Sequence, residues 1–258
     1  MRRRGLLLLP AALLSVACFE GQRTIRVKAD GSGTVVDTLV LGEQMKAMMA
    51  GADKGKEAAA KDKGKYEATA AAMGPGVRFV GEEKTAQQIK ATYAFADIRA
   101  VKIGISPGPA GEDEGGGQKK AEPLTFRLTR QGAKSTLTVV QPRPAPKETA
   151  TDASVPDAMR QMGMAMWTMM KPMMKGLKLR TVLEVDGTLV RTNSRLAKGP
   201  AITLLEMDFD QITADDANFK KFARAGDDPS ALDPRLLQAV KGIKVSPEPE
   251  VVIEFTGN

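Results

Sequence analysis

The chain has 258 residues, of which 42% are hydrophobic and 27% charged, and its formal net charge is +7. This length and apolar content suffice to bury a core, which excludes a chain that is disordered throughout. Histidine is absent and cysteine occurs once, so the chain lacks the usual general base near neutral pH, the commonest zinc ligand and the means to form an intramolecular disulfide. We therefore expect a protein that is not an enzyme and that holds no metal or cofactor.

Residues 1–17 have the pattern of a cleaved secretory signal peptide. Three arginines follow the first methionine, an apolar run comes next, and small residues precede Cys18. The apolar run is too short to span a bilayer as a permanent helix. We therefore predict that the chain is exported and that the mature protein begins at Cys18.

The five residues that end at Cys18 resemble the lipobox of bacterial lipoproteins. They read Leu-Ser-Val-Ala-Cys, and they depart from the usual pattern at Ser15, where leucine is commoner. The resemblance implies cleavage after Ala17 and acylation of Cys18, for example with palmitate. Attachment by two or three acyl chains is effectively permanent, since each buried methylene adds about 0.8 kcal/mol. The alternative is a plain cleaved signal peptide.

The residue after Cys18 bears on the membrane to which the protein is attached. An aspartate there resembles an inner-membrane retention signal, and this chain has Phe19. We therefore expect a location at the outer membrane, facing the periplasm. Without residues 1–17 the net charge falls to +4, because three arginines and no acidic residue are removed. The remaining lysines are scattered, which favours a membrane, a lipid or an envelope protein as partner and argues against nucleic acid.

The first half of the chain predicts hairpins and one helical region. Alternating apolar and polar residues predict strands at 25–29, 34–41, 77–80, 89–95, 98–105, 124–128 and 137–139. Alanine and lysine at 43–73 favour one or two helices. The glycine-rich residues 106–123 predict a mobile loop, and the proline-rich residues 141–156 predict a linker.

A methionine-rich segment follows this linker. Eight of the 14 methionines lie between Met159 and Met174. On a helical wheel, one apolar face collects six of them, namely Met159, Met162, Met166, Met169, Met170 and Met173. This face is interpreted in three ways: as core, as an adaptable apolar face for a lipid or a partner helix, or as a thioether site for copper(I). We favour the core, because such spacing is typical of any buried helix, and rank copper(I) last.

The last third of the chain predicts more strands and helices. Residues 177–185 alternate and then meet Asp186-Gly187, which predicts a hairpin with residues 188–192. Further strands are predicted at 201–209 and 251–255. Thr213 and Asp216 form a capping signature for a helix that carries Phe219 and Phe222.

Because the predicted strands are clustered and linked by hairpins, the sequence favours an α+β fold with a mainly antiparallel sheet and packed helices, including the methionine-rich amphipathic helix. We expect this fold to occupy residues 24–258, either as one domain or as two halves divided by the linker 141–156.

The order of these features resembles that of bacterial envelope lipoproteins, including the LppM-type domains of mycobacteria. The shared features are the lipobox, an Asp-Gly hairpin near residue 30 and, later in the chain, a strand, a turn, a Thr-Asn pair and another strand. LppM-type proteins are lipid-anchored and linked to lipid binding. The resemblance implies a non-enzymatic binding or structural role in the cell envelope, with a carrier of lipids or other apolar ligands as the alternative.

Overall fold

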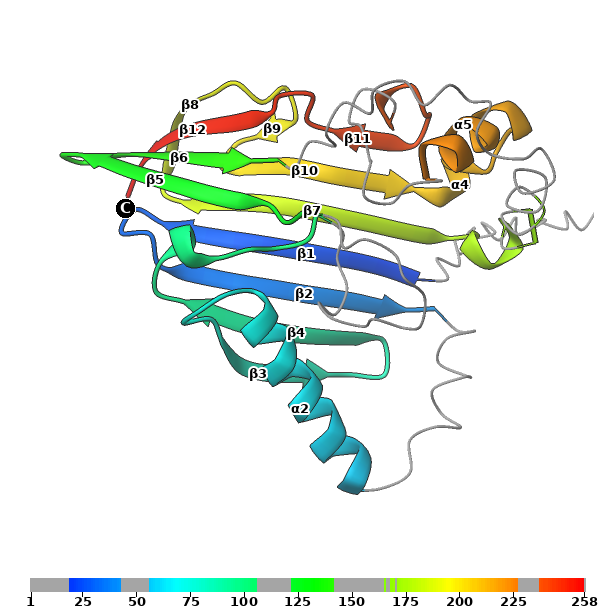
Figure 1. Ribbon diagram of the computed structural model, residues 1–258, viewed down its shortest axis with the longest axis horizontal. Coiled ribbons are helices and arrows are strands. Elements are labelled where there is room, and N and C mark those ends of the chain that lie inside the picture. Colours follow the sequence, from blue (N-terminus) through cyan, green and yellow to red (C-terminus); the bar gives the residue numbers. More distant parts are fainter. Residues whose placement is uncertain are drawn as a thin grey trace, which may run out of the picture.

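The computed structural model describes residues 19–42, 56–105, 122–141, 165, 168–169, 171–226 and 237–257. Its strands form an eight-stranded and a four-stranded sheet, and helices pack beside them (Figure 1). The two sheets share one core, so the smaller sheet lies against one face of the larger. This architecture confirms the predicted α+β class. No helix in the described ranges combines the length and apolar character needed to cross a bilayer.

The large sheet has the strand order β11-β10-β7-β1-β2-β4-β3, with β9 paired to β10. β1 and β7 pair in parallel and the other neighbours pair antiparallel. Its strands are β1 (Phe19–Lys28), β2 (Gly33–Leu41), β3 (Arg78–Lys84), β4 (Gln88–Phe95), β7 (Leu177–Asp186), β9 (Ala197–Lys198), β10 (Ala201–Asp208) and β11 (Ile243–Val245).

The small sheet is antiparallel throughout, in the order β5-β6-β12-β8. Its strands are β5 (Thr125–Gln131), β6 (Lys134–Val140), β8 (Thr188–Thr192) and β12 (Glu250–Thr256). The helices are α2 (Lys56–Ala72), α4 (Phe209–Ile212) and α5 (Asp216–Gly226), with 3₁₀ turns η1 (Ile98–Ala100) and η3 (Lys171–Met174).

Two apolar clusters lie on the same face of the large sheet. The first joins Ile25 and Leu183 of the large sheet with Leu137 of the small sheet. The second lies near α5, where the ring centroids of Phe209 and Phe222 are 5.6 Å apart in an edge-to-face contact. These contacts follow from strand alternation, since every second side chain points to the covered face.

The structure extends the first strand toward the N-terminus. β1 begins at Phe19, so the domain start expected at residue 24 falls inside a paired strand. Most of the predicted linker, residues 142–156, lies outside the described residues. Its first residue, Gln141, is buried, and the side-chain amide of Gln141 donates a hydrogen bond of 2.9 Å to the backbone carbonyl of Glu248.

Two local predictions are wrong because short polar side chains cap the backbone. The predicted strand at 98–105 is instead the turn η1 followed by a single bridge between Ile103 and Leu124. Asp97 caps this turn by accepting a hydrogen bond of 2.9 Å from the backbone N–H of Arg99. Likewise, Asp215 caps α5, accepting from the N–H groups of the next helical residues, in place of Thr213.

The predicted hairpin at Asp186-Gly187 is also wrong. Both edges of β7 are occupied, by β1 and by β10, so β8 leaves the large sheet and pairs with β12. Gly187 sits at this corner with φ of +152°, and a Cβ there would lie 1.9 Å from the carbonyl oxygen of Thr256. The Asp-Gly pair therefore marks a crossing between sheets, which glycine alone accommodates.

Gly187→Ala tests this corner. We expect a loss of about 3 kcal/mol in the free energy of unfolding, from backbone strain together with the clash against Thr256. Urea denaturation followed by circular dichroism measures the loss. Gly81→Ala is the matched control, because no heavy atom lies within 4 Å of the added Cβ. Equal midpoints for the two variants would show that the corner does not require glycine.

Candidate functional site

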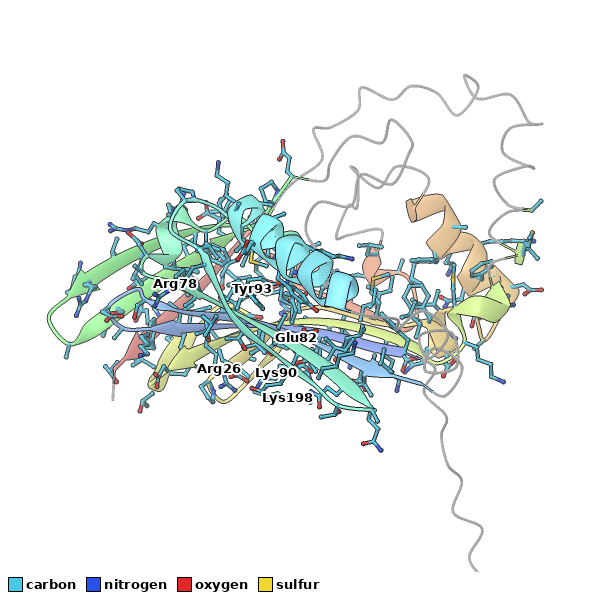
Figure 2. All side chains as sticks on the ribbon, turned by 90° about the horizontal axis from the view of Figure 1, so that it is seen from below. Arg26, Arg78, Glu82, Lys90, Tyr93 and Lys198 are labelled. Atoms are coloured by element: carbon cyan, nitrogen blue, oxygen red, sulfur yellow. The ribbon has the colours of Figure 1, made fainter. Side chains whose placement is uncertain are left out.

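One face of the large sheet is free of any described layer. α2 and Tyr93 lie on one side of the sheet, and Arg26, Lys90 and Lys198 lie on the other (Figure 2). We call this second side the open face. It is formed by alternate side chains of neighbouring strands, which include Gln22, Thr24, Arg26, Thr34, Val36, Thr38, Lys90, Thr92, Arg180, Val182, Glu184, Thr203 and Glu206.

Ion pairs cross the open face between directly opposed residues. Arg26 pairs with Glu184 at 2.8 Å across β1 and β7, where the two residues are in register. Lys90 pairs with Glu83 at 3.0 Å across β4 and β3. Such exposed pairs contribute about 0.2–1 kcal/mol each, and they neutralise much of the charge on this face.

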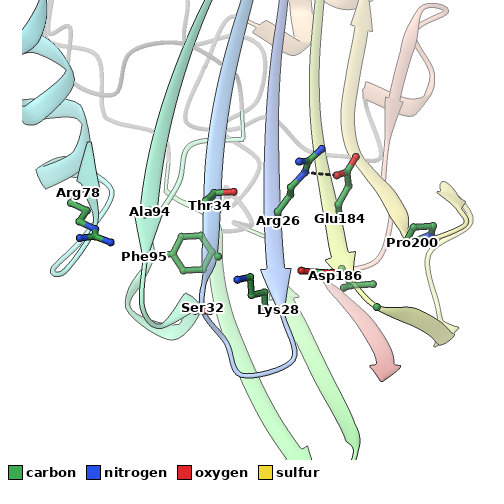
Figure 3. Close-up of a pocket in the computed structure, with 13 residues that line it drawn as sticks. Arg26, Lys28, Ser32, Thr34, Arg78, Ala94, Phe95, Glu184, Asp186 and Pro200 are labelled. Atoms are coloured by element: carbon green, nitrogen blue, oxygen red, sulfur yellow. Dashed lines mark hydrogen bonds and ion pairs between the residues drawn. The ribbon is translucent and has the colours of Figure 1, made fainter. Parts of the chain in front are cut away.

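A shallow depression of about 660 Å³ lies at the end of the open face where β1 and β7 end and β2 begins (Figure 3). Phe95 and Thr34 line it together with charged side chains, and Arg26 is held by its pair with Glu184. Within the described residues, no ion pair involves the other two cations of the depression, Lys28 and Arg78. The lining therefore offers cationic donors to a ligand, beside the carboxylate of Asp186, which is in register with Lys28.

A second depression of about 700 Å³ adjoins the first and shares Arg26 and Thr34 with it. Its lining combines charged side chains, among them Glu82, Glu83 and Lys90, with hydroxyl and amide groups from residues that include Gln22, Thr24, Thr38, Gln88 and Thr92. Hydroxyls and amides both donate and accept hydrogen bonds, so the two depressions form a polar surface suited to a hydroxylated molecule. Among the described residues, no three His, Cys, Asp or Glu side chains converge as a metal site would require.

A buried ion pair lies on the covered face of the same strands. Arg23 is 1% exposed, and its Nε and Nη2 donate to the two carboxylate oxygens of Asp37 at 2.6 and 2.7 Å. Its Nη1 donates to the carbonyl of Gly104 at 3.2 Å, and the hydroxyl of Thr181 donates to the next carbonyl, of Ile105, at 2.6 Å. These bonds hold the segment after η1 against β1, β2 and β7.

Tyr93 lies near this ion pair, and its pKa reflects the same buried surroundings. Burial raises the pKa of Tyr93 to about 12, and the negative charge of Asp37 acts in the same direction. The tyrosine hydroxyl therefore stays neutral under ordinary conditions. We infer that the buried polar cluster of Arg23, Asp37 and Thr181 stabilises the large sheet on the side opposite the open face.

Arg23→Met tests this stabilising role. It leaves the Asp37 carboxylate without its partner beneath the covering layer, so we expect a loss of about 3–5 kcal/mol in the free energy of unfolding. The double variant Arg23→Met/Asp37→Leu should recover much of that loss. Arg26→Met on the open face, where the arginine side chain is 63% exposed, is the control and should change stability by less than about 1 kcal/mol. Similar losses for Arg23→Met and Arg26→Met would contradict this assignment.

Most of the predicted site residues lie outside the described residues. These are Cys18 and Met159, Met162, Met166 and Met170. Met173 belongs to η3, and Met169 is 82% exposed. Met174, which the helical wheel left off the apolar face, is buried in the second cluster. The proposed methionine face therefore remains a prediction.

The open face was not singled out from the sequence, although its signal is present. Gln22, Thr24 and Arg26 alternate with Arg23 and Ile25, as in a strand with one solvated side. Alternation alone does not tell which strands become neighbours. The sequence therefore gave no sign that the polar sides of β1, β2, β4 and β7 would form one continuous surface.

The fold and surface define an α+β domain with one open polar sheet face. No family model matches the chain, and no curated protein matches it. Among solved structures, it is similar to the folded domain of LppM from Mycobacterium tuberculosis, determined by NMR. The alignment covers 100% of this chain and 96% of that domain, with 8% identity and a TM-score of 0.31.

Proposed function

We propose that this chain is a lipid-anchored protein of the bacterial cell envelope with a non-enzymatic binding or structural role. The observation that carries the proposal is the N-terminal sequence pattern: three arginines, an apolar run and the lipobox-like Leu-Ser-Val-Ala-Cys, which ends at the only cysteine of the chain. Cleavage directly before Cys18 would leave every described strand and helix in the mature protein.

The proposed location is the outer membrane, with the domain in the periplasm. Phe19 in place of an aspartate supports this choice. The net charge of +4 after cleavage supports contact with anionic lipid headgroups. We assign the binding role to the open face, because its two adjoining depressions combine cationic and hydroxyl groups that no described layer covers.

Cys18→Ala tests the anchor. We expect the protein to move from the detergent phase to the aqueous phase on partition with Triton X-114, and to lose labelled palmitate, because the acylated sulfur is gone. The control variant Cys18→Ala/Ala133→Cys places the single thiol in an exposed turn. It should also be aqueous and unlabelled, since acylation requires the lipobox context. An aqueous, unlabelled wild-type protein would refute the proposal.

A carrier of apolar ligands is the second candidate. The observation in its favour is Met169, a large apolar side chain that is 82% exposed. Methionine is flexible and polarisable, and therefore adapts to varied apolar ligands.

The variant Met162→Leu/Met166→Leu/Met169→Leu separates this candidate from the other interpretations of the methionine face. Volume is nearly conserved, so each change should alter stability by less than about 1.5 kcal/mol. A core role predicts no change in function, whereas a carrier role predicts altered uptake of a fluorescent fatty acid. Copper(I) capture predicts loss of copper(I) or silver(I) binding on titration. Binding of copper(I) by wild type that the variant abolishes would reverse our ranking.

A further inference from the structure

The proposed anchor leaves no linker between the lipid and the large sheet. Consecutive Cα atoms are about 3.8 Å apart, so Cys18 lies within one residue of the start of β1. Phe19 is already paired on both sides, with Leu41 of β2 and with Leu177 of β7. A strand that is hydrogen-bonded to a neighbour on each side cannot move independently of its sheet. Acyl chains on Cys18 therefore tether a defined end of the domain.

Several strands reach the same level at this end. Leu41 donates a backbone hydrogen bond of 2.8 Å to the carbonyl of Gln87 in the β3–β4 turn. On the other side of β1, Lys178 of β7 is paired in register with Asp208 of β10. We call this end, formed by Phe19, Leu41, Gln87, Leu177 and Asp208, the anchored rim.

The surface beside the rim carries exposed apolar and cationic side chains, and the carboxylate of Asp208 in the rim pairs with Lys178 at 3.6 Å. Of the four large hydrophobic residues exposed among the described ones, Val40 adjoins Leu41, and Met169 precedes η3 and β7. Lys175 is exposed between η3 and β7. Apolar side chains enter the interfacial region, and lysines contribute about 1 kcal/mol each near anionic headgroups.

We propose that the end of the domain formed by the anchored rim, η3, α4 and α5 rests on the bilayer and that the large sheet stands upright on it, with the open face directed sideways into the periplasm (Figure 1). This orientation rests on the proposed lipid anchor. The alternative, in which the open face lies flat on the membrane, would desolvate its ion pairs and threonine hydroxyls. The upright orientation leaves the ion pairs in water and both depressions accessible.

The opposite end of the domain is then far from the lipid. The ten residues of β1 span about 30 Å at about 3.3 Å each. Beyond them, the hydroxyl of Ser135 in β6 donates to the carbonyl of Ala29 at 2.9 Å. The β5–β6 turn at Gly132 and Ala133 therefore lies past the distal end of β1, as Figure 1 shows.

Three single labels in the full-length lipidated protein test the orientation. Ala86→Cys places a thiol in the β3–β4 turn at the rim, Ala133→Cys places one in the distal turn, and Lys198→Cys places one on the side of the open face. All three positions are exposed, and the acylated Cys18 does not react with a maleimide fluorophore. Each variant is bound to vesicles of phosphatidylethanolamine and phosphatidylglycerol that contain a lipid with a nitroxide on its headgroup.

We expect the label at residue 86 to lose most of its fluorescence, and those at residues 133 and 198 to keep theirs. Equal quenching at residues 86 and 133, or stronger quenching at 198 than at 86, overturns the upright orientation. Flotation of the vesicles separates this failure from failure of the anchor. Protein that does not float with the vesicles refutes the anchor, and with it the orientation, whereas floating protein with the wrong quenching pattern refutes the orientation alone.

Discussion

The large sheet depends on the parallel pairing of β1 with β7. All ten residues of β1 are in register with β7, and nine of them also pair with β2. On one side of this seam lie β2, β4 and β3, which come from the first hundred residues, and on the other lie β7, β10 and β11 from the last third. Without the seam, each group of strands would be a small sheet with an unpaired edge. The seam also allows the outward side chains of both groups to form one surface.

The polar pair inside the fold strengthens the same seam. Arg23 on β1 binds Asp37 on β2, and its backbone is in register with Thr181 on β7. Both Arg23 and Thr181 then hold carbonyls of residues 104 and 105. A buried arginine with a bidentate partner has a strict geometry, so this cluster favours one register among the central strands. The positions of Arg26, Thr24 and Thr34 on the open face follow from that register.

The sequence predicted where the strands lie along the chain better than it predicted which strands pair with one another. Alternation located β1, β2, β4, β6 and β12, because a half-buried strand leaves a period of two. It did not predict that the chain crosses to the small sheet at Asp186-Gly187, since a glycine with positive φ is compatible with both a hairpin turn and a crossing between sheets. It also missed η1, where Asp97 turns the backbone locally although residues 98–105 have the apolar content of a strand. The candidate surface was not predicted for a related reason: it is a property of strand order, which involves residues more than a hundred positions apart.

The same long separation affects how the chain matures. β1 begins at Phe19, yet its parallel partner begins at Leu177, so the central seam cannot form until most of the chain has been synthesised. Pairings between such distant segments form slowly, because a long loop must close before any contact is gained. Under the export that we propose for this chain, such a delay would keep the polypeptide unfolded and able to pass through a membrane pore before the central strands pair.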